Sequence, residues 1–434
     1  DGIELFLFTD GAFPPVPELP PTLSQSEFHF VGPGKDTENG ALVSVELDLG
    51  LDAPRRVYAP VANPGKRTQR RTLSLFRAGE VIEPLGPGID RHRWRQFAEA
   101  GFQRITTPVA DGGLGRSTVE AMLAFEGLGH GCSDNGLVFA LSSQVFATQN
   151  AFRSAATDEQ KQRYLPGLLS GETFGAFAIT EPDAGSDSSA IRTTASRIDG
   201  HADDPHHPDA VYEVSGEKCW ITLGPMADLI ILFATTDPSL GRWGITAFAV
   251  PTDRAGVVLG PSVKKLGLDS SPFGSIWFDR CRLTAADRLG PEGGGGGVFT
   301  KAVEGERAFL FAGQLGATRR VIEQSIDRAR TPQYDGSISG TGQSVSHRIA
   351  DMKLHHEMAR LLVYKAAALN DRGRSVGMAA ALAKLQASES AVETALEALT
   401  IHGPGGALLE HPAPGHLHDA IGGLAYSGTC LLYT

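Results

Sequence analysis

The sequence lacks the concentrated positive charge, the paired cysteines and the long apolar runs that mark several large classes of protein. Its formal net charge is -11, and no dense basic block occurs beyond Arg67, Arg70 and Arg71, so a nucleic-acid partner is not expected. The four cysteines are widely spaced without a CxxC pair, which argues against a zinc site or disulfide framework and favours a reducing cytoplasm. No window approaches about 18 continuous apolar residues, and Leu5 to Phe8 is too short for a signal-peptide core, so no membrane association is expected.

Histidines gather at two places, but neither predicts a metal site. His416 and His418 fall with His411 in a segment rich in Pro and Gly, which predicts a loop. The adjacent His355 and His356 would point about 100° apart on a helix and would not share a ligand face. No bound metal is expected.

The periodicity of apolar residues divides the chain into four parts. With 434 residues and 41% hydrophobic composition, the chain can bury a large core and is too long for one simple domain. Residues 1–80 form an N-terminal extension of uncertain structure, in which the alternating run Leu42 to Leu49 predicts a strand. Residues 81–174 follow a helical pattern, residues 175–289 a strand pattern, and residues 290–434 a helical pattern again. The expected fold class is α+β.

Local signals support this division. Thr157 and Gln160 have the spacing of a capping box and predict a helix start. The Gly293 to Gly297 run has no strand-to-helix context and predicts a mobile connector. Strands and long amphipathic helices are predicted at these positions: 211–214, 229–234, 245–250 and 275–278 for strands, and 300–330, 345–371 and 376–401 for helices packed as a bundle.

Two motifs carry a family resemblance. The segment from Phe174 to Asp187, FGAFAITEPDAGSD, resembles the first signature of acyl-CoA dehydrogenases, and the segment from Lys218 to Thr222, KCWIT, resembles the second. Further matches follow in the family's order, so that about residues 85 to 434 are covered. The resemblance implies an N-terminal helical domain, a central β-barrel or sandwich domain, a C-terminal four-helix bundle, and FAD as the cofactor.

The residues of these motifs are consistent with flavin binding. An isoalloxazine ring needs an apolar or aromatic wall and polar donors at its edge, and both are offered by the following set: Phe177, Ile179, Thr180, Trp220 and Thr222. By resemblance, Gly185 and Ser186 approach the pyrophosphate and the thioester, so Ser186 would also bind substrate. The alternative is a Trp of a β-core beside a polar turn.

The adenosine half of FAD is held in the family by an arginine and a glutamine from a neighbouring subunit. The resemblance assigns Gln343 and, in a segment that departs from the pattern, Arg330. Arg330 is also explained as an arginine at a helix C-terminus, where the dipole favours positive charge. Gly403 lies in the loop over the cofactor, where Pro404 removes one backbone donor. A homodimer or homotetramer is expected.

The usual catalytic glutamate is absent. Most members carry it in a Tyr-Glu-Gly-Thr motif, whereas this chain has Ser427 at that place, and a serine without a partnered base cannot remove the proton alpha to a thioester. A smaller branch, resembling isovaleryl-CoA and long-chain dehydrogenases, carries the base on the helix matched here by Glu306. Arg307 and Ser427 are then expected to contact substrate. The alternative is that Glu306 merely favours a helix N-terminus.

Three functions remain open from the sequence. The first is FAD-dependent α,β-dehydrogenation of an acyl thioester, held on coenzyme A or on acyl carrier protein, by a dehydrogenase or oxidase that passes electrons to an electron-transfer flavoprotein or to oxygen. The second is a flavin-dependent oxygenase on the same fold, and the third is a non-catalytic or nucleic-acid-associated relative. Fold similarity alone does not choose among them.

Overall fold

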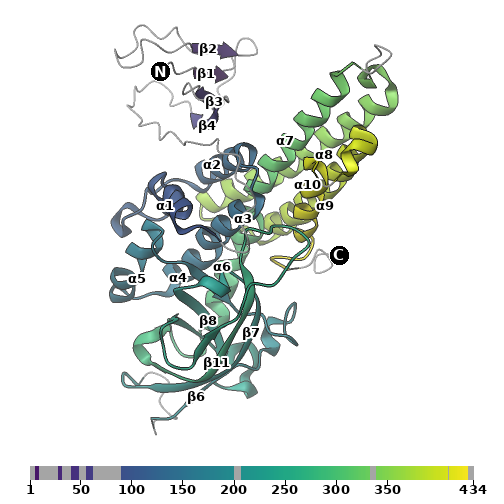
Figure 1. The fold of residues 1–434 in the computed structure, drawn as a ribbon. Coiled ribbons are helices and arrows are strands. Elements are labelled where there is room, and N and C mark those ends of the chain that lie inside the picture. Colours follow the sequence, from purple (N-terminus) through teal and green to yellow (C-terminus); the bar gives the residue numbers. More distant parts are fainter. Residues whose placement is uncertain are drawn as a thin grey trace.

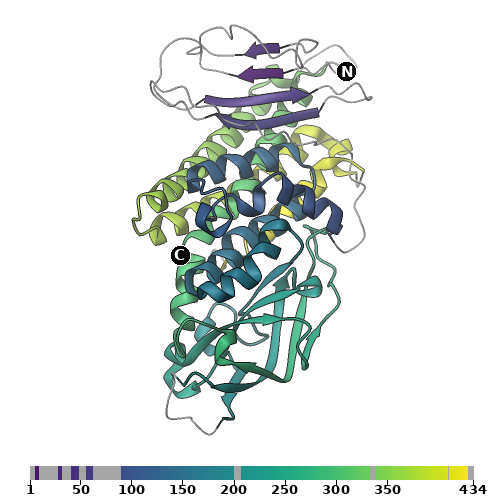
Figure 2. The same ribbon diagram turned by 90° about the vertical axis from the view of Figure 1, so that its left-hand side faces the viewer.

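The computed structural model describes residues 89–199, 207–332, 339–408 and 410–428, and the course of four strands between residues 5 and 61. A helical region lies between these strands and the central sheet (Figures 1 and 2). The predicted fold class is confirmed, because the order along the chain is helical, β and helical. None of the described helices is long and apolar enough to cross a membrane.

The N-terminal strands form two separate pairs. They are β1 (Leu5–Phe8), β2 (Phe28–Val31), β3 (Ala41–Leu47) and β4 (Arg55–Val61). β1 and β2 run parallel, and β3 and β4 run antiparallel. β3 coincides with the strand predicted from the alternating run that begins at Leu42.

The first helical region covers one end of the sheet. Its helices are α1 (Arg91–Glu99), α2 (Thr118–Gly131), α3 (Asn135–Ser143), α4 (Gln149–Ala155) and α5 (Asp158–Ser170). The predicted capping box at Thr157 is confirmed, since its hydroxyl accepts from the Gln160 N–H while the Gln160 side chain accepts from the Thr157 N–H. The fully buried rings of Trp94 and Phe125 lie in the core of this region.

The central domain is built on one sheet. Its strands are β5 (Gly175–Ala178), β6 (Thr194–Arg197), β7 (Val211–Thr222), β8 (Leu229–Thr235), β9 (Ile245–Pro251), β10 (Val257–Leu259), β11 (Phe273–Thr284) and β12 (Arg288–Leu289). The described strands follow the order β10-β11-β7-β6-β8-β9-β12, and β5 pairs with β8. Every residue of β8 is buried, as expected for a central strand covered on both faces.

The C-terminal region is a bundle of long helices. These are α6 (Gly295–Phe309), α7 (Phe311–Arg330), α8 (Gln343–Asp371), α9 (Gly377–His402) and α10 (Pro412–Gly422). Between α6 and α7, Leu310 keeps helical backbone angles, so the two form a nearly continuous rod. The prediction of a loop around His416 and His418 is wrong, because both lie in α10. Pro412 stands at its first position, where a proline costs no helical hydrogen bond.

The glycine run before the bundle corrects another prediction. Gly295 to Gly297 are not a connector but the first turn of α6. A Cβ on Gly295 would lie 2.8 Å from the carbonyl oxygen of Ile245 and 2.9 Å from the nitrogen of Ala247, so this helix start packs directly on the backbone of β9. Close approach of two backbones, rather than mobility, explains why glycine stands here.

The run therefore yields a matched pair of substitutions. Gly295→Ala should lower the free energy of unfolding by about 1–3 kcal/mol, because the added methyl overpacks the contact with β9. Gly297→Ala should raise it by about 0.5–1 kcal/mol, because Gly297 is exposed in the same helix with nothing within 4 Å of its Cβ position. Denaturant unfolding of both variants measures this. Equal effects would contradict the backbone contact.

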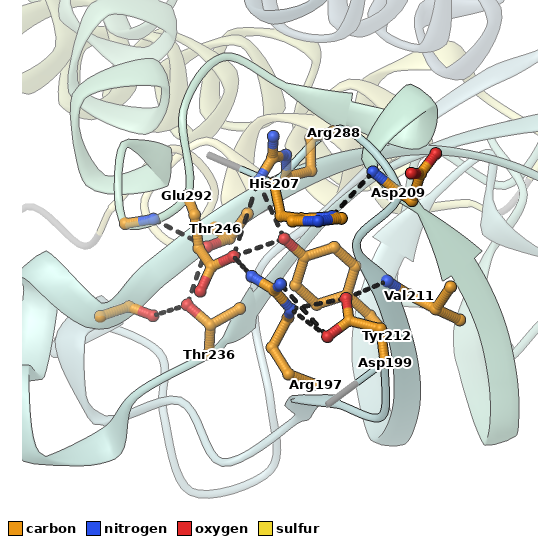
Figure 3. Close-up of polar contacts among 12 residues, drawn as sticks. Arg197, Asp199, His207, Asp209, Val211, Tyr212, Thr236, Thr246, Arg288 and Glu292 are labelled. Atoms are coloured by element: carbon orange, nitrogen blue, oxygen red, sulfur yellow. Dashed lines mark hydrogen bonds and ion pairs between the residues drawn. The ribbon is translucent and has the colours of Figure 1, made fainter. Parts of the chain in front are cut away.

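A polar network fixes the chain just before α6 (Figure 3). Glu292 accepts from Arg197 at 3.2 Å and from the Tyr212 hydroxyl, and Arg288 donates to that hydroxyl at 2.9 Å. The next residue, Gly293, donates its N–H to the Thr246 hydroxyl at 2.9 Å. The charged groups of this network are largely buried, and hydrogen bonds are stronger there than in water. The network therefore restrains the chain at the point where it enters α6.

α6 connects the two halves of the molecule. Val298 and Ala302 on its first turns belong to the apolar core under the sheet, while Ala308 and Phe309 on its last turn belong to the core of the helical regions. Glu306 lies between these two sets. The helix thus places this carboxylate at the junction of the β-domain and the helices.

Candidate active site

A buried ion pair joins the two signature segments. The Lys218 ammonium, at the start of the second segment, lies 2.6 Å from Glu181 Oε1 of the first and donates to the Ile179 carbonyl at 3.0 Å. Lys218 is fully buried, and Glu181 also accepts the backbone N–H groups of Arg192 and Thr193. Burial lowers the pKa of Lys218 to about 8. Although burial alone would raise the pKa of Glu181, the ammonium and these hydrogen bonds hold it below its usual value.

This ion pair between Lys218 and Glu181, called the clamp below, brings the predicted flavin-edge residues together. The Cys219 N–H donates to the Thr180 carbonyl at 2.9 Å, so Trp220 and Thr222 of β7 follow directly beside the end of β5. Leu223, which follows Thr222, belongs to the same core as Phe309 of α6. The segment that carries Trp220 and Thr222 is therefore packed into the same apolar core as the end of α6.

The shape of this edge fits a planar ring system. Trp220 is 59% exposed, adopts a left-handed φ of +59°, and stacks on Phe273 with ring centroids 5.8 Å apart. The hydroxyls of Thr180 and Thr222 are partly exposed and bond no other residue in the described part of the chain. An open indole beside free hydroxyls supplies both the aromatic surface and the donors that an isoalloxazine requires.

The apolar members of the predicted set are placed deeper. Phe177 is half-buried and contacts Phe233 and Phe299, with centroids 5.1 Å and 6.2 Å away, while Ile179 is buried in the same core. Both residues thus line the wall between β5 and α6. Gly185 and Ser186 lie beyond this wall on an exposed turn, and a Cβ on Gly185 would meet nothing within 4 Å.

The residues predicted for the adenosine half and for the loop over the cofactor lie elsewhere, at helix ends. Arg330 is the last residue of α7 and Gln343 the first of α8, and both are exposed. Gly403 ends α9 with a φ of +69° and open space around its Cβ position. No hydrogen bond among the described residues joins these three to the flavin-edge set.

Glu306 and Ser427 meet, although they are far apart in sequence. The Ser427 hydroxyl donates to Glu306 Oε1 at 2.7 Å. Only 8% of Glu306 is exposed. The serine that replaces the usual glutamate and the proposed alternative base therefore occupy one site.

The environment of Glu306 suits a proton acceptor near neutral pH. Burial raises the pKa of Glu306 to about 7, against the hydrogen bond from Ser427 and the positive charge of Arg307, which lower it. A general base is most effective when its pKa lies near the working pH. Burial, together with the Glu306 carboxylate, also raises the pKa of the neighbouring Tyr426 phenol, so Tyr426 stays neutral.

A small cavity of about 10 Å³, room for about one water molecule, lies beside Tyr426. It lies among Asn135, Val138, Phe139, Leu268, Leu310, Gly313, Gln314 and Tyr426. The Tyr426 ring packs against Phe139 and Phe311, at centroid distances of 4.5 Å and 5.3 Å. The side-chain amide of Gln314 bonds no other residue of the described chain, and it lines this cavity.

Sequence reasoning missed the roles of Lys218, Glu181 and the cavity residues. The ion pair could have been predicted from the sequence. A lysine and a glutamate stand inside two apolar signatures, and a charge buried in such a segment needs a partner. Phe139 and Gln314 carried no such signal, because their facing depends on how α3 and α7 pack.

Comparison with known proteins matches most of the chain to one family. The chain matches the N-terminal domain of acyl-CoA dehydrogenase over residues 81–172, the middle domain over 176–281 and the C-terminal domain over 293–430. The L-prolyl peptidyl-carrier protein dehydrogenase of Pseudomonas fluorescens is 39% identical over 337 residues, covering 78% of this chain and 86% of the relative. Among solved structures, a prolyl acyl carrier protein oxidase is 36% identical with a TM-score of 0.76, covering 80% of this chain and 89% of that one. PigA with FAD and proline is 31% identical with a TM-score of 0.75, covering 80% and 88%.

Proposed function

Because this chain belongs to the acyl-CoA dehydrogenase family and is an FAD-dependent oxidoreductase of acyl thioesters, we propose that it dehydrogenates a small aminoacyl thioester, such as prolyl, on a carrier protein. The observation that carries the chemistry is the buried Glu306 carboxylate at the junction of the domains. The relatives named for prolyl carrier-protein substrates support the choice of thioester.

The residues divide the reaction between them. When bound, FAD would supply the acceptor for a hydride from the substrate. Glu306 removes the proton alpha to the thioester carbonyl, since its raised pKa lets it hold that proton. Thr180, Thr222 and Trp220 would hold the flavin ring, and Ser186 and Arg307 would contact the thioester arm.

A second copy of the chain is proposed to complete the FAD site as a homodimer or a dimer of dimers. Apolar residues lie open along one face of α8 (Leu354, Met358 and Leu361) and of α9 (Met378, Leu382 and Leu396). Several exposed apolar side chains on neighbouring helices are typical of an interface. Gln343 and Arg330 at the helix ends would then reach the adenosine half of FAD in the partner.

The electron acceptor is proposed to be an electron-transfer flavoprotein or oxygen, and the compartment the cytoplasm. Cys132, Cys219 and Cys281 are free thiols, and burial raises the pKa of both Cys132 and Cys219 to about 11. Unreactive, unpaired thiols suit a reducing compartment.

The test compares substrates by flavin absorbance. Anaerobic mixing of the FAD-loaded protein with prolyl carrier protein should bleach the flavin at least about tenfold faster than mixing with prolyl-CoA or butyryl-CoA, because the acyl group and its carrier are both recognised. Admission of air then separates the acceptors, since rapid reoxidation indicates oxygen. Faster bleaching by butyryl-CoA than by either prolyl thioester would contradict the proposal.

A further inference from the structure

Ser427 stands in a backbone conformation that serine rarely adopts. Its φ is +57°, in the left-handed region, and the following Gly428 has a φ of +90°. Glycine reaches this region without cost, whereas a residue with a Cβ is strained there. A serine at this point therefore keeps a strained backbone where glycine would relieve it.

The surrounding structure holds this turn in place. Tyr426 is fixed by ring contacts with Phe139 and Phe311. Two residues earlier, the Leu424 carbonyl accepts from the buried Lys384 ammonium of α9 at 3.2 Å. Ring contacts and a hydrogen bond therefore both hold this turn, and the Ser427 hydroxyl points toward α6 in a fixed direction.

The geometry points to a positioning role, which rests on the proposed function of Glu306. We propose that Ser427 orients the Glu306 carboxylate for proton removal through the 2.7 Å hydrogen bond to Oε1, leaving Oε2 to face the substrate. A hydrogen bond to an ionised acceptor also favours the ionised form, so the serine keeps the base deprotonated in a buried site. Ser427 is thus a positioning residue in the place of the family's usual base.

Few charged or titratable groups act on Glu306 besides this hydroxyl. Arg307 follows it on α6 and favours its ionisation, and the Tyr426 phenol stands beside it and stays neutral. From α9, which packs on α6, Lys384 faces the segment that carries Ser427. Both cations remain in any Ser427 variant, so a change in pH dependence reports the lost hydroxyl.

Two variants separate the hydroxyl from the backbone. Ser427→Ala removes Oγ and keeps the strain, whereas Ser427→Gly removes Oγ and relieves it. Both should lower the anaerobic rate constant of flavin reduction by prolyl carrier protein about tenfold at pH 7, the usual scale for a hydrogen bond to a charged group. Both should also move the pH profile of reduction to higher pH, because the hydrogen bond that favours the ionised carboxylate is lost.

The outcomes are distinct. Wild-type rates and pH profiles in both variants would overturn the positioning role while leaving Glu306 as base. A defect in Ser427→Ala that Ser427→Gly restores would assign the effect to the backbone and would also overturn it. Full activity of Glu306→Gln, measured alongside, would instead defeat the proposed function. FAD content and melting temperature of each variant confirm that it is folded.

Discussion

Glu306→Gln is expected to retain thioester binding and to lose flavin reduction by roughly 10²- to 10⁴-fold, the scale for removing a general base. The amide keeps the shape of the side chain and can still accept the hydrogen bond from Ser427, but it cannot take a proton. Anaerobic stopped-flow absorbance with prolyl carrier protein measures the rate, and a binding titration measures affinity. Glu389→Gln, on the exposed face of α9, serves as the control and should reduce its flavin normally.

The pH dependence gives the same experiment a second readout. In the wild type the reduction rate should rise with pH through about 7, as Glu306 loses its proton. Because the folded pKa lies above the ordinary value of 4.5, the folded state holds this proton more tightly than the unfolded chain does. The contribution of Glu306 to the free energy of unfolding therefore falls between pH 4.5 and about 7, and Glu306→Gln should remove that fall. Unchanged reduction in Glu306→Gln would favour the oxygenase alternative.

Because Glu306 and Ser427 are in contact, the carboxylate that acts as the base can be transferred from position 306 to position 427. Combining Glu306→Gly with Ser427→Glu should restore part of the reduction rate, because the two side chains reach one point from different elements. The left-handed backbone at Ser427 disfavours a larger side chain, so recovery should be incomplete. No recovery in a folded, FAD-loaded double variant would count against convergence on the same substrate atom.

Lys218→Met should have the largest effect on stability. It leaves the Glu181 carboxylate buried without its ammonium partner, which costs about 3–5 kcal/mol of the free energy of unfolding. The clamp between the two signature segments is lost with it, so FAD retention should fall. The loss should be smaller at acidic pH, because an unpartnered Glu181 can take up a proton and lose its charge.

Two controls test the clamp. Lys264→Met removes an exposed lysine of the same domain and should change the free energy of unfolding by no more than about 0.5 kcal/mol. The double variant Lys218→Met with Glu181→Met should regain most of the stability, since no isolated charge remains buried. Denaturant unfolding and the FAD-to-protein absorbance ratio measure both properties. If the Lys218→Met protein were as stable as the Lys264→Met protein, the ion pair between Lys218 and Glu181 would not stabilise the fold as proposed.

The sequence by itself determined the order of the domains, the family and the cofactor. Strand and helix periods differ enough to separate residues 175–289 from their neighbours, and the signatures at Phe174 and Lys218 are local strings whose chemistry is legible without coordinates. The capping box at Thr157 was equally local. The glycine run at Gly293 was misjudged because its reason, contact with the backbone of β9, is not local.

Only the tertiary structure decided how the site is assembled. Glu306 and Ser427 are adjacent because α6 and the turn after α10 pack together, and no period or spacing along the chain encodes a contact over that separation. The same holds for the raised pKa of Glu306, which follows from burial between two cores, and for the cavity beside Tyr426. The residue types in the sequence determine which reactions are possible. Packing determines which carboxylate is shielded from water and held in the orientation that a reaction requires.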